Sequence, residues 1–159
     1  MGVGLVGLAP LPGRGGELMN DIGRIQGWGA TMVVSLTTLE EMTDKGVVEL
    51  GQTLEGKGVK WRHFPVADFG APSAVVAERW TLISGEARAT LKSGGNVLFH
   101  CHGGCGRSGM AVLRVMVEAG LPASDALSAL RAVRPCAIET DAQMEWAIAS
   151  HSSYGDLGK

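Results

Sequence analysis

The chain has 159 residues, with 14 basic and 16 acidic side chains and a formal net charge of -2. A chain of this length can bury about 68–70% of its unfolded surface without disulfides or metals, so one domain is the expectation. We predict that this domain covers residues 1–159, with a core over about 11–149 and a flexible tail over 150–159. The nearly balanced charge provides no overall field toward nucleic acid or an anionic membrane, and we expect neither as a partner.

The cysteine count is three, an odd number that suits free thiols in a reducing compartment better than a disulfide framework. We therefore predict a cytoplasmic protein, and a monomer by default. Residues 1–8 are apolar but too short, and without a basic flank, to be a signal peptide or a membrane helix. Their GxGxxG string has no preceding strand and no evident acidic partner, which argues against a dinucleotide site.

The first half of the chain alternates between strand and helix patterns. Residues 1–8 predict a strand, and helical spacing of apolar residues predicts a surface helix over 17–28. A short β-branched run predicts a buried parallel strand over 31–36. Further along, the pattern predicts a helical turn over 38–42, a helix over 47–54 and a strand over 59–64.

The second half continues the same alternation after a loop, residues 64–72, that carries two prolines and a glycine. Ser73 is the predicted cap of one continuous helix that ends at 93–95. A strand over 97–99, an apolar helix from 107 to 120, a helix over 122–133 and a last helix over 144–148 follow. This order predicts an α/β fold with a central, mainly parallel sheet and helices on both faces.

The most informative stretch is Leu98–Gly109, with the sequence LFHCHGGCGRSG, in which a strand runs through a glycine-rich loop into a helix. Five residues separate Cys101 from Arg107, and three of them are glycines. Such a loop can turn several N–H groups toward one point while a planar guanidinium closes the ring. The helix N-terminus and the guanidinium both favour the thiolate form of Cys101. The stretch therefore predicts a site for a tetrahedral oxyanion with a nucleophile beneath it.

These residues resemble the cysteine-dependent protein tyrosine phosphatase family, whose signature is His-Cys, five residues, then Arg and Ser or Thr. Together with the upstream stretch FPVADFGAP, the loop is most similar to the dual-specificity branch. The resemblance implies the phosphotyrosine phosphatase-like fold, no cofactor and no metal. It also implies hydrolysis of phosphate monoesters on protein tyrosine, with serine and threonine as further substrates, through a cysteinyl-phosphate.

The resemblance also implies roles for individual residues. Cys101 is the nucleophile, and Asp68, 33 positions earlier, is the general acid. Arg107 binds the phosphate together with the loop, whose residues are His102, Gly103, Gly104, Cys105 and Gly106.

Three further residues support this chemistry in the family. His100 braces the loop, and Ser108 stabilises the returning thiolate. Gln143 places the hydrolytic water, or only caps a helix with Thr140, because the family's first Gln of this motif is Glu139 here.

Several alternatives remain open at this level. His100, Cys101, His102 and Cys105 are all possible zinc ligands, although Arg107 would repel a cation. A second alternative is a weakly catalytic module that binds phosphoproteins. A third is a phosphatase for a phosphoinositide, an RNA 5′ phosphate or a small metabolite, although the loop lacks the lysines typical of phosphoinositide enzymes. A neighbouring thiol can trap a sulfenic acid as a disulfide, which makes Cys105 a candidate redox partner of Cys101.

Overall fold

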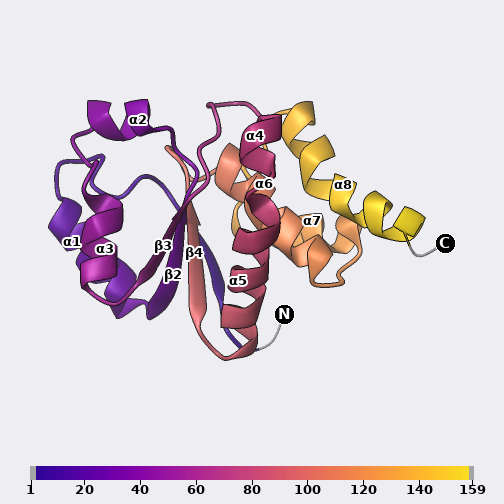
Figure 1. Cartoon of the computed structure of the whole chain (residues 1–159), viewed down its shortest axis with the longest axis horizontal. Helices are drawn as coiled ribbons and strands as arrows, with labels where there is room; N and C mark the ends of the chain where they lie inside the picture. Colours follow the sequence, from indigo (N-terminus) through magenta and orange to yellow (C-terminus); the bar gives the residue numbers. More distant parts are fainter. Residues whose placement is uncertain (1–2, 158–159) are drawn as a thin grey trace.

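A computed structural model describes residues 3–157, with side chains up to residue 149. Its centre is a four-stranded, fully parallel sheet with the strand order β1-β4-β2-β3 (Figure 1). The strands are β1 (Val6–Ala9), β4 (Asn96–His100), β2 (Ala30–Ser35) and β3 (Lys60–His63). The predicted α/β class with a parallel sheet is confirmed.

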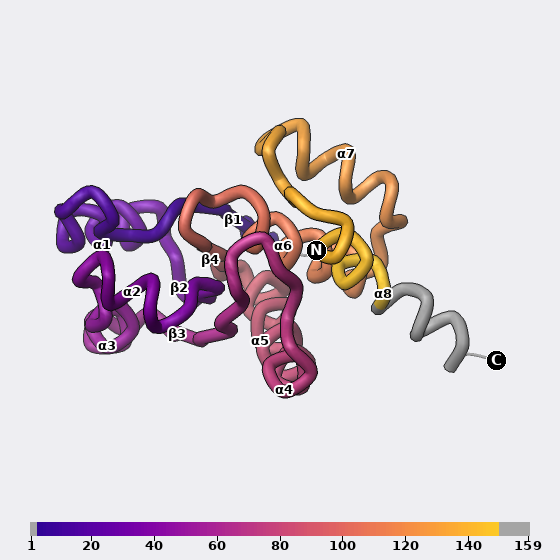
Figure 2. Tube along the Cα trace, turned by 90° about the horizontal axis from the view of Figure 1, so that it is seen from above, coloured from indigo at the N-terminus to yellow at the C-terminus, as the bar shows by residue number. Residues whose placement is uncertain are grey.

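Helices cover both faces of this sheet (Figures 1 and 2). On one side lie α1 (Leu18–Gly27), α2 (Leu39–Asp44) and α3 (Leu50–Gly56). On the other lie α4 (Ala74–Ala77), α5 (Trp80–Lys92), α6 (Gly106–Glu118), α7 (Ala123–Val133) and α8 (Asp141–Leu157). Among the described helices, none is long and apolar enough to cross a membrane.

Each face of the sheet buries its own apolar cluster, because side chains alternate along a strand. Val33 and Leu98 point into the cluster beneath α1 and α3. Their neighbours Val34 and Phe99 point into the larger cluster beneath α5, α6 and α8, whose centre is the buried helix α6.

The single helix predicted after Ser73 is wrong in one respect, since it is divided into α4 and α5. Arg79 N donates to Val76 O and closes a tight turn between them. None of the α4 side chains is buried, whereas α5 begins at Trp80, which is only 2% exposed. The separate packing of the two segments thus overrides a continuous helical pattern.

The last helix begins at Asp141, three residues earlier than predicted. The predicted tail after residue 149 lies outside the described side chains.

The carboxyl ends of the strands position the candidate site, as expected for an open parallel sheet. Ser35 ends β2 and His100 ends β4, and these two residues are paired in the strand register. The loop 101–105 then leads from β4 directly into α6, so the loop is anchored at both ends by buried elements.

Candidate active site

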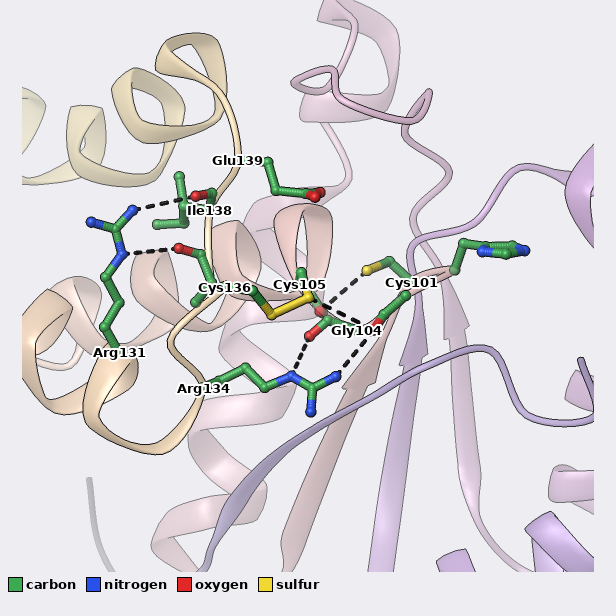
Figure 3. The surroundings of a disulfide bond; sticks show 12 residues. Cys101, Gly104, Cys105, Arg131, Arg134, Cys136, Ile138 and Glu139 are labelled. Atoms are coloured by element: carbon green, nitrogen blue, oxygen red, sulfur yellow. Dashed lines mark hydrogen bonds between the residues drawn. A yellow bond between two sulfur atoms is a disulfide. The ribbon is translucent and has the colours of Figure 1, made fainter.

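Each carbonyl group of the loop 101–105 accepts a hydrogen bond from a group outside the loop, in most cases from another segment of the chain. Arg134 donates to Gly104 O at 2.9 Å through Nε and to Gly103 O at 3.0 Å through Nη2 (Figure 3). On the other side of the loop, His102 O accepts from Leu11 N at 3.0 Å and from Arg14 Nη1 at 3.1 Å.

The end of the loop is bound in the same way. Cys105 O accepts from Gly109 N at 3.0 Å and from Ile138 N at 3.2 Å. With these carbonyls bonded to groups outside the loop, the N–H groups of residues 102–105 find no carbonyl partner among the described residues. Converging, unpartnered N–H groups beside a helix N-terminus form an anion-binding cradle.

Cys101 lies at the base of this cradle and is 3% exposed. Its Sγ is 3.2 Å from Ser108 Oγ, in the first turn of α6. A hydroxyl at this position can donate a hydrogen bond to a thiolate sulfur. The structure therefore brings the predicted nucleophile and Ser108 into direct contact.

Arg107 is held by a buried ion pair that the sequence did not reveal. Its Nη1 and Nη2 atoms donate to the two carboxylate oxygens of Glu41 at 2.7 and 2.8 Å, and Nη1 also donates to Val66 O. Burial opposes the charges, but the hydrogen bonds outweigh it: the pKa of Glu41 falls to about 2 and the pKa of Arg107 is raised. The guanidinium thus stays charged and fixed although it is 1% exposed.

The sequence did not single out Glu41, because helix capping alone explains a glutamate at this position. Thr38 and Glu41 form a capping box at the start of α2, with Thr38 Oγ1 accepting from Glu41 N and Glu41 Oε2 accepting from Thr38 N. The same carboxylate reaches Arg107, 66 positions along the chain. The one feature of the sequence that could have pointed to Glu41 is its place shortly after the end of a predicted strand, where a parallel sheet positions its site.

His100 is completely buried in a chain of hydrogen bonds that determines its tautomer. His100 Nδ1 lies 3.2 Å from Cys101 O, and because a carbonyl oxygen can only accept, Nδ1 carries the proton and donates. Nε2 of the neutral ring therefore accepts from the Ser35 hydroxyl 2.5 Å away, and Ser35 Oγ accepts in turn from Trp61 Nε1–H at 2.8 Å. Burial lowers the pKa of His100 to about 4, so the ring is neutral and holds the first carbonyl of the loop. This contact fits the predicted bracing role.

Asp68 lies on the loop 64–72, with 51% of its side chain exposed and Oδ1 3.3 Å from Arg107 Nη2. The next residue, Phe69, has φ +63, a left-handed conformation that is unusual for a bulky residue. Two bonds from the start of α8 hold this bend: Thr140 Oγ1 donates to Phe69 O at 3.1 Å, and Gln143 Nε2 donates to Gly70 O at 3.2 Å. A carboxyl group in this position can exchange protons with solvent and with a group bound at Arg107.

Gln143 is fully buried and makes one of the two contacts of the capping box with Thr140, since its backbone N donates to Thr140 Oγ1 at 3.2 Å. Its Oε1 accepts from Glu139 N at 2.9 Å, one residue before the position that a capping box uses. Its carboxamide also lies 3.0 Å from where a Cβ on Gly106 would stand, and the Glu139 carboxylate covers the same glycine. Gln143 is therefore beside the loop as well as at the cap.

The expectation of three free thiols is wrong for two of them, because a disulfide joins Cys105 to Cys136 (Figure 3). Their Cα atoms are 5.2 Å apart, within the usual range. Cys101 is free. While this bond exists, Cys105 has no thiol with which to trap an oxidised Cys101, so that hypothesis does not describe this state. Within the part of the chain that the structure describes, no three His, Cys, Asp or Glu side chains gather as a metal site would require.

Comparison with known proteins places this geometry in a family. Residues 15–147 match the family model PTP-SAK, the Swiss Army Knife protein, DSP-PTPase phosphatase domain. The chain belongs to the dual-specificity phosphatase family. The chain is also similar to cyclin-dependent kinase inhibitor 3 of Mus musculus, with 28% identity over 135 residues, and the match covers 81% of this chain and 63% of the mouse protein. The chain thus matches less than two thirds of that curated relative.

Solved phosphatase structures share the fold. Kinase associated phosphatase (KAP), in a form with its catalytic site cysteine changed to serine, superposes with a TM-score of 0.81 at 23% identity and covers 94% of this chain and 87% of its own. Tk-PTP in its active form superposes with a TM-score of 0.73 at 29% identity, covering 94% of this chain and 92% of its own.

Proposed function

We propose that this dual-specificity phosphatase domain hydrolyses phosphate monoesters on proteins through a cysteinyl-phosphate intermediate. The observation that carries the proposal is the buried Cys101 sulfur at the base of a loop whose carbonyls are all bonded to groups outside the loop. Beside it stands a guanidinium that Glu41 keeps charged and fixed. Fixed amides and a fixed guanidinium favour the charge that develops on phosphoryl oxygens in the transition state.

In the first step the Cys101 thiolate attacks phosphorus while Arg107 and the loop amides hold the non-bridging oxygens. The bond from phosphorus to the substrate oxygen breaks, and protonated Asp68 gives its proton to the departing alkoxide or phenoxide. The 3.3 Å contact between Asp68 and Arg107 keeps this acid at the edge of the phosphate position.

In the second step water attacks the phosphorus of the cysteinyl-phosphate, and Asp68, now ionised, takes a proton from that water. Gln143 is the candidate to place the water, since its carboxamide lies against Gly106 and is bonded to Gly70. Cys101 leaves as a thiolate, and the Ser108 hydroxyl 3.2 Å away stabilises it with a hydrogen bond.

Phosphoproteins are the proposed substrate class, phosphotyrosine first and phosphoserine or phosphothreonine next. The loop side chains, His102 and Cys105 among three glycines, bring no lysine to meet a second phosphate on an inositol ring. A cytoplasmic location and a monomeric state belong to the same proposal.

Steady-state rates of the wild type and two variants test these roles. Cys101→Ser should abolish turnover of aryl phosphates and phosphopeptides alike, because serine lacks the thiolate. Asp68→Asn should slow a phosphoserine peptide by roughly 100-fold, and p-nitrophenyl phosphate much less, because nitrophenolate leaves without a proton. Equal rates for Cys101→Ser and the wild type would leave a phosphate-binding module as the function, and turnover of a phosphoinositide in preference to every phosphopeptide would overturn the substrate class.

A further inference from the structure

The disulfide between Cys105 and Cys136 connects two parts of the candidate site that otherwise meet through hydrogen bonds and packing. Cys105 is the fourth of the five residues between the nucleophile and Arg107, and it is the N-cap of α6. Cys136 lies in the connection 134–140 between α7 and α8, 31 positions away. The bond therefore fastens the phosphate-binding loop directly to this connection (Figure 3).

The connection is held in a conformation that its own sequence disfavours. Ile138 has φ +67, in the left-handed region that a β-branched side chain avoids. Three hydrogen bonds hold it there: Ile138 N donates to Cys105 O, and Arg131 donates to Ala137 O and Ile138 O. The disulfide is the one covalent tie among these contacts, since in the described chain no other disulfide exists.

Beyond Ile138 the same connection reaches the loop that carries Asp68. Thr140 is bonded to Phe69 O and Gln143 to Gly70 O, so the two residues that follow Asp68 depend on where the connection lies. A continuous path thus runs from Cys105 through Cys136 and Ile138 to the candidate acid. A change at the disulfide is expected to act on Asp68 more than on the buried Cys101.

The bond is open to reagents in solution. Cys136 is an exposed residue and Cys105 is half-buried, whereas Cys101 is 3% exposed. Thiol–disulfide exchange needs an accessible bond for the attacking thiolate, and of the two bonded cysteines Cys136 is the more exposed residue. Disulfides in a reducing compartment are mostly transient and redox-sensing, which reconciles this bond with the proposed cytoplasmic location.

We infer that Cys105 and Cys136 form a reversible redox site that adjusts the general-acid step, with the disulfide as the more active state. The rate effect rests on the proposed phosphatase function. A dithiol reductant opens the bond: one thiolate attacks the Cys136 sulfur and releases the Cys105 thiolate, and the second closes the reductant's own disulfide and releases Cys136. Two electrons pass to the protein, and its two thiolates take up protons. A low-molecular-weight disulfide such as oxidised glutathione reverses the exchange.

Opening the bond should slow the reaction selectively. The connection loses its one covalent tie to the loop and keeps only its hydrogen bonds and the packing of Ala137 and Ile138, so the bend after Asp68 loses a fixed support. Phenyl phosphate needs a protonated leaving group, so its turnover should fall about fivefold, a small part of the contribution of a positioned general acid. The matched substrate p-nitrophenyl phosphate has a better leaving group and should change much less.

Mass spectrometry tests the bond without any reference to activity. In Cys101→Ser only Cys105 and Cys136 remain, so a disulfide within the monomer can only join these two. Protein purified without reductant should be lighter than the reduced protein by two hydrogen atoms, and a dithiol reductant should restore them. Two free thiols in protein equilibrated with oxidised glutathione would overturn the inference.

Rates on the two aryl phosphates test the consequence. Reductant should slow wild-type turnover of phenyl phosphate, and oxidised glutathione should restore it. Cys136→Ser should have the slower rate under both conditions, and the reversible wild-type comparison covers the case in which this variant folds poorly. Equal wild-type rates in both redox states would overturn the inference and leave the proposed function intact. No turnover in either state, with the bond mapped, would instead overturn the proposed function and the rate effect with it.

Discussion

Arg107 is a cation that the fold buries almost completely, and Glu41 is the residue that makes this burial tolerable. Removing one partner of a buried pair costs about 3–5 kcal/mol, because the remaining charge has lost its compensation. Because the Glu41 side chain is 22% exposed, we expect the loss of stability on replacing it to lie at the lower end of that range. The pair has a functional consequence too, because a guanidinium that moved could not offer fixed donors to phosphate.

Glu41→Gln should therefore lower both activity and stability. The amide keeps one acceptor but loses the negative charge and one of the two bonds to Arg107. We expect kcat/KM on an aryl phosphate to fall by about tenfold or more, which corresponds to about 1.4 kcal/mol of transition-state stabilisation. The rates and the urea midpoint of unfolding should be measured together.

The neighbouring residue provides the control for this prediction. Glu40 has the same charge as Glu41 and lies in the same helix, but it is exposed and has no hydrogen bond or ion pair with Arg107. Glu40→Gln should leave both kcat/KM and the urea midpoint within error of the wild type. If the two variants lost activity equally, the effect would come from the charge of α2 and not from the bond to Arg107.

At the scale of elements, the loop 101–105 depends on Gly104 far more than on the neighbouring Gly103. Gly104 has φ +77, and a Cβ added there would lie 2.8 Å from the backbone carbon of Ala9 and 2.7 Å from Arg134 Nη2. A Cβ on Gly103 would meet nothing within 4 Å. The two positions differ only in conformation and crowding, since both carbonyls accept from Arg134.

Gly104→Ala should accordingly destabilise the protein, and Gly103→Ala should not. The strain of a left-handed alanine costs of order 1–3 kcal/mol, and displacing Arg134 or the chain at Ala9 adds to it. Urea unfolding should show a clearly lower midpoint for Gly104→Ala and nearly the wild-type midpoint for Gly103→Ala. Equal midpoints for the two variants would contradict the conformational role assigned to Gly104.

Most of the elements could be predicted from the sequence, because each depends on a local period. The buried run at 31–36 and the apolar helix after Arg107 are legible without any knowledge of their partners. The break between α4 and α5 was not, because it follows from the packing of Trp80. The Cys105–Cys136 bond was not predictable either, since an odd cysteine count favours free thiols and only the folded chain brings these two Cα atoms to 5.2 Å.

In the candidate site, too, the residues of a contiguous motif could be predicted, whereas those that the fold brings in from distant segments could not. The loop with Cys101 and Arg107 is contiguous, so its pattern could be read directly, and Asp68 could be assigned by resemblance. Glu41, Ser35 and Arg134 come from three other segments. The strand order β1-β4-β2-β3 and the packing of α7 bring them to the site, and neither can be deduced from the sequence alone.

For the whole molecule, the buried His100 links stability to pH. Burial lowers the pKa of His100 from 6.5 to about 4 in the folded protein, while the unfolded chain keeps the ordinary value. Between these two values the unfolded chain binds a proton at residue 100 and the folded protein does not. Stability should therefore rise with pH through this window and level off above about 6.5. The difference of 6.5 − 4 = 2.5 pKa units is worth roughly 3 kcal/mol.

Carboxyl groups affect the stability of the protein at lower pH than His100 does, so their contribution can be measured separately from that of His100. Glu86 in α5 accepts hydrogen bonds from Arg62 and Lys60, which lower its pKa from 4.5 to about 2. The pKa of Glu41 is lowered to the same value, and the stability that these two groups provide is lost only as pH falls from about 4.5 toward 2. Urea unfolding of the wild type between about pH 5 and 7 should thus report on His100 alone among these three. His100→Asn removes the titrating ring, so the variant should be less stable near neutral pH but should show little slope in that range. A wild-type profile that is flat over the same range, or an equal slope in His100→Asn, would mean that another group carries the linkage.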